Sequence, residues 1–223
     1  KDKVQGKAMV EAALEINHWC AGEVMYQGTD MRTGSALEIY RSGVGRCGEE
    51  AVFVVNVMRS AGIPARPVYV PRWSHCDDNH AWVEVWCDGD WHYLGACEPE
   101  AVLDKGWFTN AASRAMMIGS RWYDRAMPDE KVIGKDGMNR IINLLGKYAK
   151  TRWITITVED LDGTPAAEAK VRAEVMNYGE FSPIAIMEAD KNGCISFETG
   201  FGSLLICAVY DGAYGEKVID TRS

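Results

Sequence analysis

The chain has 223 residues, 47% of them apolar and 25% charged, a balance typical of a globular protein with room for one large or two small domains. Its net charge of −8 gives no electrostatic reason to bind nucleic acid or an anionic membrane. No run of eighteen apolar residues occurs, so we expect no membrane span, and the start at Lys1 suggests a piece or a processed form of a longer protein.

Three helical segments are predicted in the first 62 residues, over 4–20, from Ala36 to near Gly43, and over 46–61. The third is the best defined, because apolar residues recur at spacings of four, three and four, and Gly62 can cap its C-terminus. These residues on one face are Cys47, Ala51, Val54 and Met58.

Beyond the third helix the apolar pattern changes to the alternation typical of strands, at 66–70, 80–86 and 91–94. Asp88-Gly89 is a strong signal for a two-residue hairpin turn. Continuing that ladder places His80 opposite Cys97, or opposite Glu98 if Gly95 permits a one-residue bulge. The polar residues 71–79 are expected to form a loop.

After residue 100 the pattern of apolar and polar residues changes again. Residues 101–150 are mixed, with a helix predicted around 138–148. After Thr151, short alternating segments at 153–158, 171–175 and 204–210 are separated by turn signals, which indicates an all-β sandwich of about 70 residues. We therefore predict two domains, 1–150 and 151–223. The turn signals are Asp162-Gly163, Asn192-Gly193 and Asp211-Gly212.

Cys47 is the candidate nucleophile, because a thiol at a helix N-terminus has its anion stabilised by unpaired N–H groups and the helix dipole. Gly45 and Gly48 leave room for a substrate backbone, so we count them as candidate substrate-binding residues. His80, at the start of a strand, is suited to act as the base. Glu98 is the candidate carboxylate that orients the imidazole.

The other cysteines are dispersed, and their odd total of seven leaves at least one thiol unpaired, so they do not resemble a disulfide scaffold. No zinc-type spacing is present, and we expect neither a metal nor another cofactor. Trp73 and Trp82 are expected either to pack in the core or to line a substrate cleft. Arg66 can serve as a structural ion-pair partner or hold substrate, and the sequence leaves both open.

Three segments taken together resemble the core of the transglutaminase-like superfamily. They are Gly45-Arg46-Cys47-Gly48-Glu49-Glu50-Ala51, then Arg59-Ser60-Ala61-Gly62-Ile63-Pro64-Ala65-Arg66, then His80-Ala81-Trp82-Val83-Glu84-Val85. The resemblance implies a papain-like α+β core, with N-terminal helices packed on an antiparallel sheet, and a Cys-His-Asp triad with Cys47 as nucleophile and His80 as base. It places Glu98-Pro99 where the family has Asp followed by Pro.

The tail is similar to carboxypeptidase-regulatory-like or prealbumin-like β-sandwich modules, through Asp162-Gly163-Thr164-Pro165, Ala169-Lys170-Val171 and Asp190-Lys191-Asn192-Gly193. Together the two resemblances imply a cysteine-dependent hydrolase or acyl transferase, acting through a thioester on peptide, protein or glycopeptide amides, with protease or amidase activity favoured over crosslinking. They also imply an exported bacterial protein, periplasmic or at the cell surface. The alternative is a non-catalytic peptide- or glycan-binding module on the same fold. The sequence does not define an oligomeric state.

Overall fold

A computed structural model describes residues 3–28, 30, 32–122 and 132–222 of the chain. The contacts divide it into two compact units. Unit 1 comprises Lys1–Tyr69 and His80–Thr109, and unit 2 comprises Val70–Asn79 and Asn110–Ser223. This division differs from a boundary near residue 150, since residues of the 110–150 region bond to the later strands: Thr199 Oγ1 donates to the carbonyl of Met116 at 2.8 Å.

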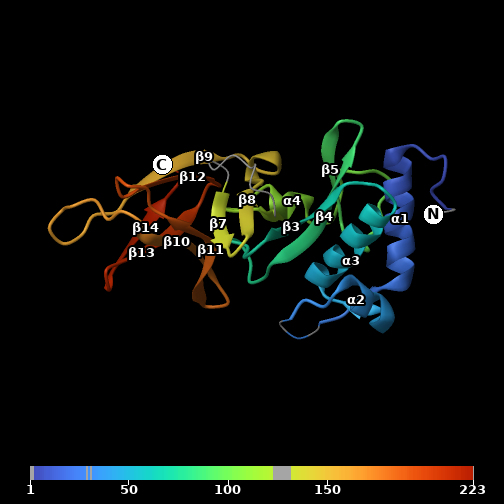
Figure 1. Ribbon diagram of the computed structural model, residues 1–223, viewed down its shortest axis with the longest axis horizontal. Coiled ribbons are helices and arrows are strands. Elements are labelled where there is room, and N and C mark those ends of the chain that lie inside the picture. The colour runs from blue at the N-terminus through green and yellow to red at the C-terminus, as the bar shows by residue number, and fades with distance from the viewer. Residues whose placement is uncertain (1–2, 29, 31, 123–131, 223) are drawn as a thin grey trace. The chain divides into compact units, whose positions relative to one another are not determined.

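Three helices make up the N-terminal part of unit 1 (Figure 1). They pack on one another through a cluster of aromatic rings. The helices are α1 (Met9–Glu23), α2 (Ala36–Ser42) and α3 (Cys47–Ser60). Trp19 of α1 lies 6.1 Å from Phe53 of α3, and Tyr40 of α2 stacks on Phe53 with ring centroids 5.8 Å apart. Each helix supplies one ring, so the cluster fixes the three helices against one another.

The ends of α2 and α3 follow from capping residues. Ser35 and Glu38 form a capping box at the start of α2, and Gly43 ends that helix in the left-handed conformation at φ 69°. The predicted apolar face of α3 is confirmed, because Ala51, Val54 and Met58 are all buried in the core of unit 1.

The sheet of unit 1 carries the predicted hairpin. Strands β3 (Ala65–Val70), β4 (His80–Cys87) and β5 (Asp90–Leu94) lie in the order β5-β4-β3. The ladder from Cys87–Asp90 to Val83–Leu94 confirms the predicted register, and Asp88-Gly89 turns with both φ angles positive. Val83 and Val85 of β4 belong to the core that also contains the apolar face of α3.

The first part of unit 2 corrects one prediction. No long helix covers 138–148: residues there form strand β8 (Asn139–Asn143) and a short 3-10 turn, η2 (Leu145–Lys147). Gly137, at φ 59°, turns the chain between β7 (Val132–Asp136) and β8, and the adjacent β-branched Ile141 and Ile142 favour a strand. The preceding elements are the short helix α4 (Thr109–Ala112) and strand β6 (Gly119–Trp122), which pairs with β8.

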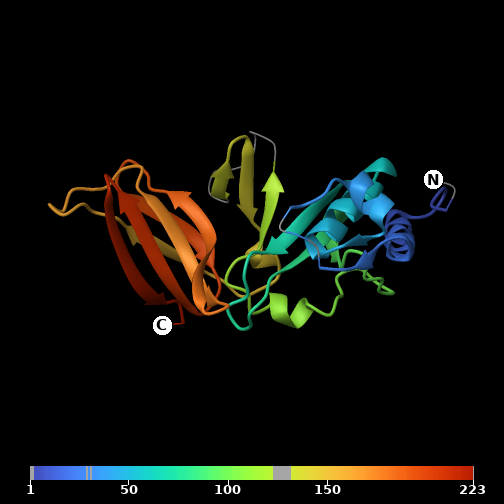
Figure 2. The same ribbon diagram turned by 90° about the horizontal axis from the view of Figure 1, so that it is seen from below.

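The rest of unit 2 is made of strands (Figure 2). A four-stranded antiparallel sheet has the order β11-β10-β13-β14, and a second pair is β12-β9. Phe197 from β12 and Leu204 and Ile206 from β13 meet in one core, so the two sheets share their apolar faces. The bounds are β9 (Arg152–Thr157), β10 (Lys170–Asn177), β11 (Glu180–Glu188), β12 (Cys194–Thr199), β13 (Ser203–Tyr210) and β14 (Ala213–Asp220).

The predicted fold class is therefore confirmed: an α+β part, with N-terminal helices on an antiparallel sheet, is followed by a β module. The turns at Gly163, Gly193 and Gly212 all have positive φ, as their sequence signals predict. Within the described part of the chain, no helix has the length and apolar character needed to cross a membrane.

Candidate active site

Cys47 is the first residue of α3, directly after the N-cap residue Arg46. The backbone N–H groups of Ala81 and Gly48 donate hydrogen bonds to its sulfur. These bonds and the Arg46 charge favour the thiolate, but burial and the Glu50 carboxylate oppose it, and burial is the largest effect. The pKa of the Cys47 thiol is raised as a result. The resting group is a thiol, so a nucleophilic role requires a base.

His80 lies beside the residue that bonds to this sulfur. It is the first residue of β4, and the N–H of the next residue, Ala81, is one of the two donors to Cys47. His80 is 5% exposed, and its ring lies among three aromatic rings. The centroid distances are 4.6 Å to Trp107, 4.9 Å to Phe108 and 5.9 Å to Trp82.

Glu98 reaches the site by a route other than the predicted bulge. The β4–β5 ladder ends at Leu94, and residues 95–98 form a tight turn in which the Glu98 N–H donates to the Gly95 carbonyl at 3.2 Å. Cys97 has a φ of 56° in this turn. A Cβ atom at position 95 would come within 2.8 Å of the Glu98 Cβ, so the turn requires glycine there.

Asn17 of α1 holds this turn in place. Its Nδ2 donates to the carbonyls of Gly95 at 2.9 Å and Glu98 at 3.3 Å, and its Oδ1 accepts from the Cys97 N–H at 3.0 Å. Asn17 is 1% exposed. A buried Asn on an otherwise apolar helix face is the one sequence feature that points to such a role.

The Glu98 carboxylate contacts the ring that packs on His80. Its Oε1 accepts a hydrogen bond from Trp107 Nε1 at 2.9 Å, and burial raises its pKa while that bond lowers it. Its Oε2 is buried and has no hydrogen-bond partner among the described residues. Glu98 is thus linked to His80 through Trp107, a residue that the sequence reasoning missed.

A second buried carboxylate, Glu50, lies in the first turns of α3. It is 4% exposed, and burial together with repulsion from Glu98 raises its pKa to about 8. Its charge raises the pKa of the Cys47 thiol and of Cys97. The site therefore contains two carboxylates that disfavour each other's charge, an arrangement that perturbs protonation near neutral pH.

Residues 32–34 are bound to the start of α3. Arg46 Nη2 donates to the Arg32 carbonyl at 2.8 Å and to Thr33 Oγ1 at 3.0 Å. Glu49 accepts from the N–H groups of Gly34 and Arg46, both at 3.1 Å. Arg46 and Glu49, the two charged residues that flank Cys47 and Gly48, therefore hold residues 32–34, which precede α2.

The predicted substrate-binding residues lie at different depths. Trp82 is fully buried and stacks on Phe108 at 4.7 Å. Trp73, in unit 2, is 2% exposed and packs against His75 at 5.3 Å. Either ring has to become accessible before it can contact a ligand, and substrate contact stays a prediction for both.

The two glycines next to Cys47 have different surroundings. Gly45 is buried, and a Cβ there would lie 3.0 Å from the Glu49 Cβ, so its small size serves packing against α3. Gly48 is partly exposed, and its nearest neighbour would be the end of the flexible Arg46 side chain at 3.1 Å. Gly48 is therefore the one of the two that borders open space.

Arg66 is a structural ion-pair partner. Its Nε and Nη2 bind Glu84 Oε2 at 2.6 and 2.5 Å, both side chains are buried, and its guanidinium lies 4.1 Å above the Trp91 ring. All seven cysteines are free thiols. In the described ranges, no group of three or more His, Cys, Asp or Glu side chains is arranged to hold a metal ion.

Comparison with known protein families gives a match to the first part of the chain. The family model of the transglutaminase-like superfamily matches residues 2–96, a span that includes Cys47 and His80 and ends before Glu98. A comparison with curated proteins gives no match.

Two solved structures are similar to this chain. A protein described as a TGase has 13% sequence identity and a TM-score of 0.36, with 43% of this chain and 28% of that chain covered. A candidate cysteine protease from Cytophaga hutchinsonii has 15% identity and a TM-score of 0.35, with 95% and 45% covered. The chain therefore spans less than half the length of either protein.

Proposed function

We propose that the transglutaminase-like domain of residues 2–96, completed by the segment that carries Glu98 and Trp107, is a cysteine hydrolase of peptide, protein or glycopeptide amides. One observation carries the proposal: the thiol at the start of α3 accepts a hydrogen bond from the N–H of Ala81, the residue after His80. Nucleophile and base thus come from neighbouring points of two elements, as a cysteine enzyme requires.

The first step is attack by the Cys47 sulfur on the amide carbonyl while its proton passes to His80. A tetrahedral intermediate forms, and it collapses to a thioester when His80 gives the proton to the departing amine. Water then attacks the thioester and His80 accepts a proton from it. When the second tetrahedral intermediate collapses, His80 returns that proton to the departing sulfur, so the Cys47 thiol is released with a carboxylic acid product. Because burial raises the pKa of the thiol, attack requires His80 to take its proton.

The two backbone N–H groups at Cys47 stabilise the charge that develops in this step. As the proton leaves, negative charge grows on the sulfur, and the N–H groups of Gly48 and Ala81 already point at it. They offset part of the cost of creating charge in a buried position. We propose hydrolysis, with crosslinking a more specialised use of the same thioester that would need an acceptor amine.

In this proposal, Glu98 acts as a positioning residue. It holds the Trp107 indole by a hydrogen bond, and the indole packs against the His80 ring. The alternative is the direct role of a triad carboxylate, which stabilises the imidazolium by its charge. Glu98→Gln separates the two, because the amide oxygen still accepts from an indole N–H but carries no charge. Positioning predicts that kcat stays within about tenfold of the original, whereas a triad role predicts a loss of about 10³-fold or more.

The test of the proposed function uses a panel of labelled peptide, glycopeptide and glutamine-donor substrates. We expect Cys47→Ala to abolish turnover, with a loss of about 10³-fold or more, and Cys76→Ala, which removes an exposed thiol, to leave it unchanged. Labelling with iodoacetamide adds a second measure, since His80→Asn should slow alkylation at position 47 alone. If Cys47 reacts no faster than Cys76 and no substrate is turned over, the chain is a binding module and the enzyme assignment is wrong.

A further inference from the structure

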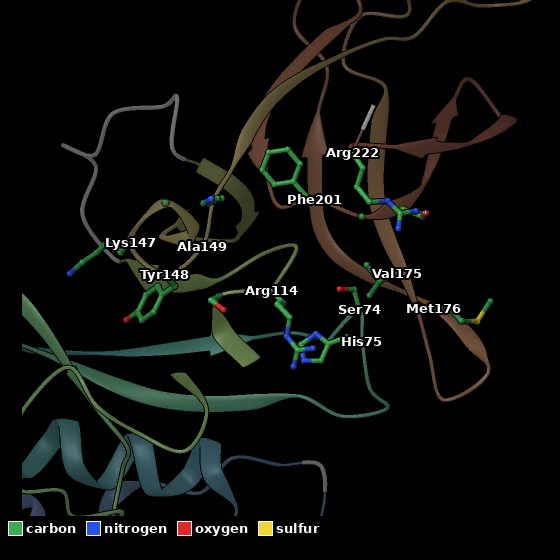
Figure 3. A pocket seen from close by; sticks show the side chains of 16 residues that line it. Ser74, His75, Arg114, Lys147, Tyr148, Ala149, Val175, Met176, Phe201 and Arg222 are labelled. Atoms are coloured by element: carbon green, nitrogen blue, oxygen red, sulfur yellow. Dashed lines mark hydrogen bonds between the residues drawn. The ribbon is translucent and has the colours of Figure 1, made fainter. Parts of the chain in front are cut away.

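Unit 2 contains a cleft of about 890 Å³ that the proposed reaction does not use. Side chains from well-separated segments line it: the 74–75 loop, the residues after α4, the turn around η2, and the ends of β10, β13 and β14 (Figure 3). Its volume lies in the range of sites that enclose a ligand of several residues or rings. The cleft is large enough to be a binding site in its own right.

The charge of this cleft is opposite to that of the whole chain. Four of its sixteen lining residues carry a positive charge: Arg114, Lys147, Lys150 and Arg222. No Asp or Glu is found among the described residues that line it, although the chain has a net charge of −8. Gathered cations repel one another, so such a cleft attracts an anionic ligand.

Two of these cations are available to a ligand. Among the residues that the structure describes, neither Arg114 nor Lys150 has a carboxylate within ion-pair distance, and the Arg114 Nε makes only a long bond of 3.4 Å to the Asn110 carbonyl. Arg222 differs from them, because its Nη2 pairs with Asp220 Oδ2 at 2.7 Å. Arg114 and Lys150 therefore contribute most of the uncompensated charge.

The pKa of His75 reflects the positive charge inside the cleft. Its imidazole lies beside the Arg114 guanidinium (Figure 3), and its pKa is lowered first by burial and then by the Arg114 charge. A carboxylate placed between the two groups would relieve this repulsion and allow His75 to gain a proton. The cleft is therefore arranged to hold an anion at that point.

The remaining lining favours a peptide over a single small anion. Val175 and Met176 lie near the end of β10, beyond Glu174–Leu205, the last pair of the β10–β13 ladder. An extended chain can bond to a strand end of this kind while the aromatic Tyr148 and Phe201 contact its side chains. The cations come from separate segments of the chain, so they match a ligand with several spaced negative charges better than a ligand with a single charge.

We propose that this cleft binds an acidic peptide in an extended conformation, with its carboxylates facing Arg114 and Lys150. The assignment is independent of the chemistry at Cys47. It makes unit 2 a recognition module for an anionic ligand.

The test is calorimetric titration of the full chain with penta-glutamate, using penta-glutamine and a pentamer of galacturonic acid as comparison ligands. We expect saturable binding of penta-glutamate that weakens between 50 and 200 mM salt, and no binding of penta-glutamine. The variant Arg114→Gln/Lys150→Gln should lose about tenfold or more in affinity. The matched control, Lys170→Gln/Lys191→Gln, removes two exposed charges outside the cleft and should change affinity by less than about twofold.

The proposal fails if penta-glutamate does not bind saturably, or if the control variant loses as much affinity as the cleft variant. Binding of the galacturonate pentamer with none of the peptide would also overturn it, because the ligand would then be an anionic glycan. The charge-conserving variant Arg114→Lys/Lys150→Arg keeps the positive field and should retain binding. Circular dichroism on each variant shows that the fold is intact.

Discussion

Replacing Glu50 by Gln should stabilise the protein, and the gain should depend on pH. The Glu50 carboxyl is buried, and its pKa is raised from 4.5 to about 8 by burial and by repulsion from Glu98. The folded state therefore keeps a proton that the unfolded state loses, between pH 4.5 and pH 8. Linkage makes stability fall as pH rises through this window, because the unfolded chain binds fewer protons than the folded one.

The magnitude follows from the size of the shift. A difference of 3.5 pH units, from 4.5 to 8, corresponds to an upper limit of about 5 kcal/mol at about 1.36 kcal/mol per unit. We discount this to about 2 kcal/mol, because small movements hydrate a carboxylate near a protein surface and weaken such effects. Glutamine has nearly the same volume and no charge, so Glu50→Gln should gain about this amount at pH 8.5 and little at pH 5.

Urea unfolding followed by tryptophan fluorescence, at intervals from pH 5 to pH 9, measures the effect. The control is Glu11→Gln, which removes an exposed carboxylate paired with Lys7 and should change stability by less than about 0.5 kcal/mol at any pH. Activity gives a second reading, since the Glu50 charge opposes formation of the Cys47 thiolate and its removal should help turnover at alkaline pH. Equal pH slopes for the original protein and Glu50→Gln would refute the reasoning.

Three further changes test the surroundings of the site. Glu84→Gln leaves the Arg66 charge buried without its partner and should cost about 3 kcal/mol in urea unfolding, whereas replacing both by Met should cost less. Gly95→Ala forces a Cβ against Glu98 and should cost about 1–3 kcal/mol and lower kcat; an unchanged kcat would show that the turn has no part in catalysis. Trp107→Phe keeps a ring beside His80 but loses the bond to Glu98, so kcat should fall by about 2- to 10-fold with KM unchanged, and Trp107→Ala should lose more.

The elements that the sequence predicts well are those with local determinants. Helix α3 begins at Cys47 and ends at Ser60, within a residue of its predicted bounds. The reason is that its signals are local: the apolar spacing lies within the helix and Gly62 follows just after it. The β4–β5 hairpin has the predicted register for the same reason, since Asp88-Gly89 fixes the turn.

The details that the sequence did not reveal depend on contacts between distant residues. Asn17 holds the turn of Glu98 across a separation of 81 residues, and no local pattern predicts such a bond. Trp107 reads as an ordinary loop aromatic until its contacts with His80 and Glu98 are known. Glu50 lies in the first turn of a helix, where the dipole favours a carboxylate, but burial beside a second carboxylate outweighs that effect and raises its pKa.

The loop before His80 is held by a residue that is synthesised much later, which affects the order in which the chain folds. Asn177 Nδ2 donates to the carbonyls of Trp73 and Cys76, both at 2.9 Å, so a residue near the end of β10 secures the loop across a separation of 104 residues. On a ribosome that adds about 5–20 residues per second, Asn177 appears several seconds after His80. Until then the stretch before the proposed base lacks these two hydrogen bonds. A nascent chain halted before β10 should therefore show weaker alkylation of Cys47 than the finished chain, which gives the C-terminal strands a part in maturation.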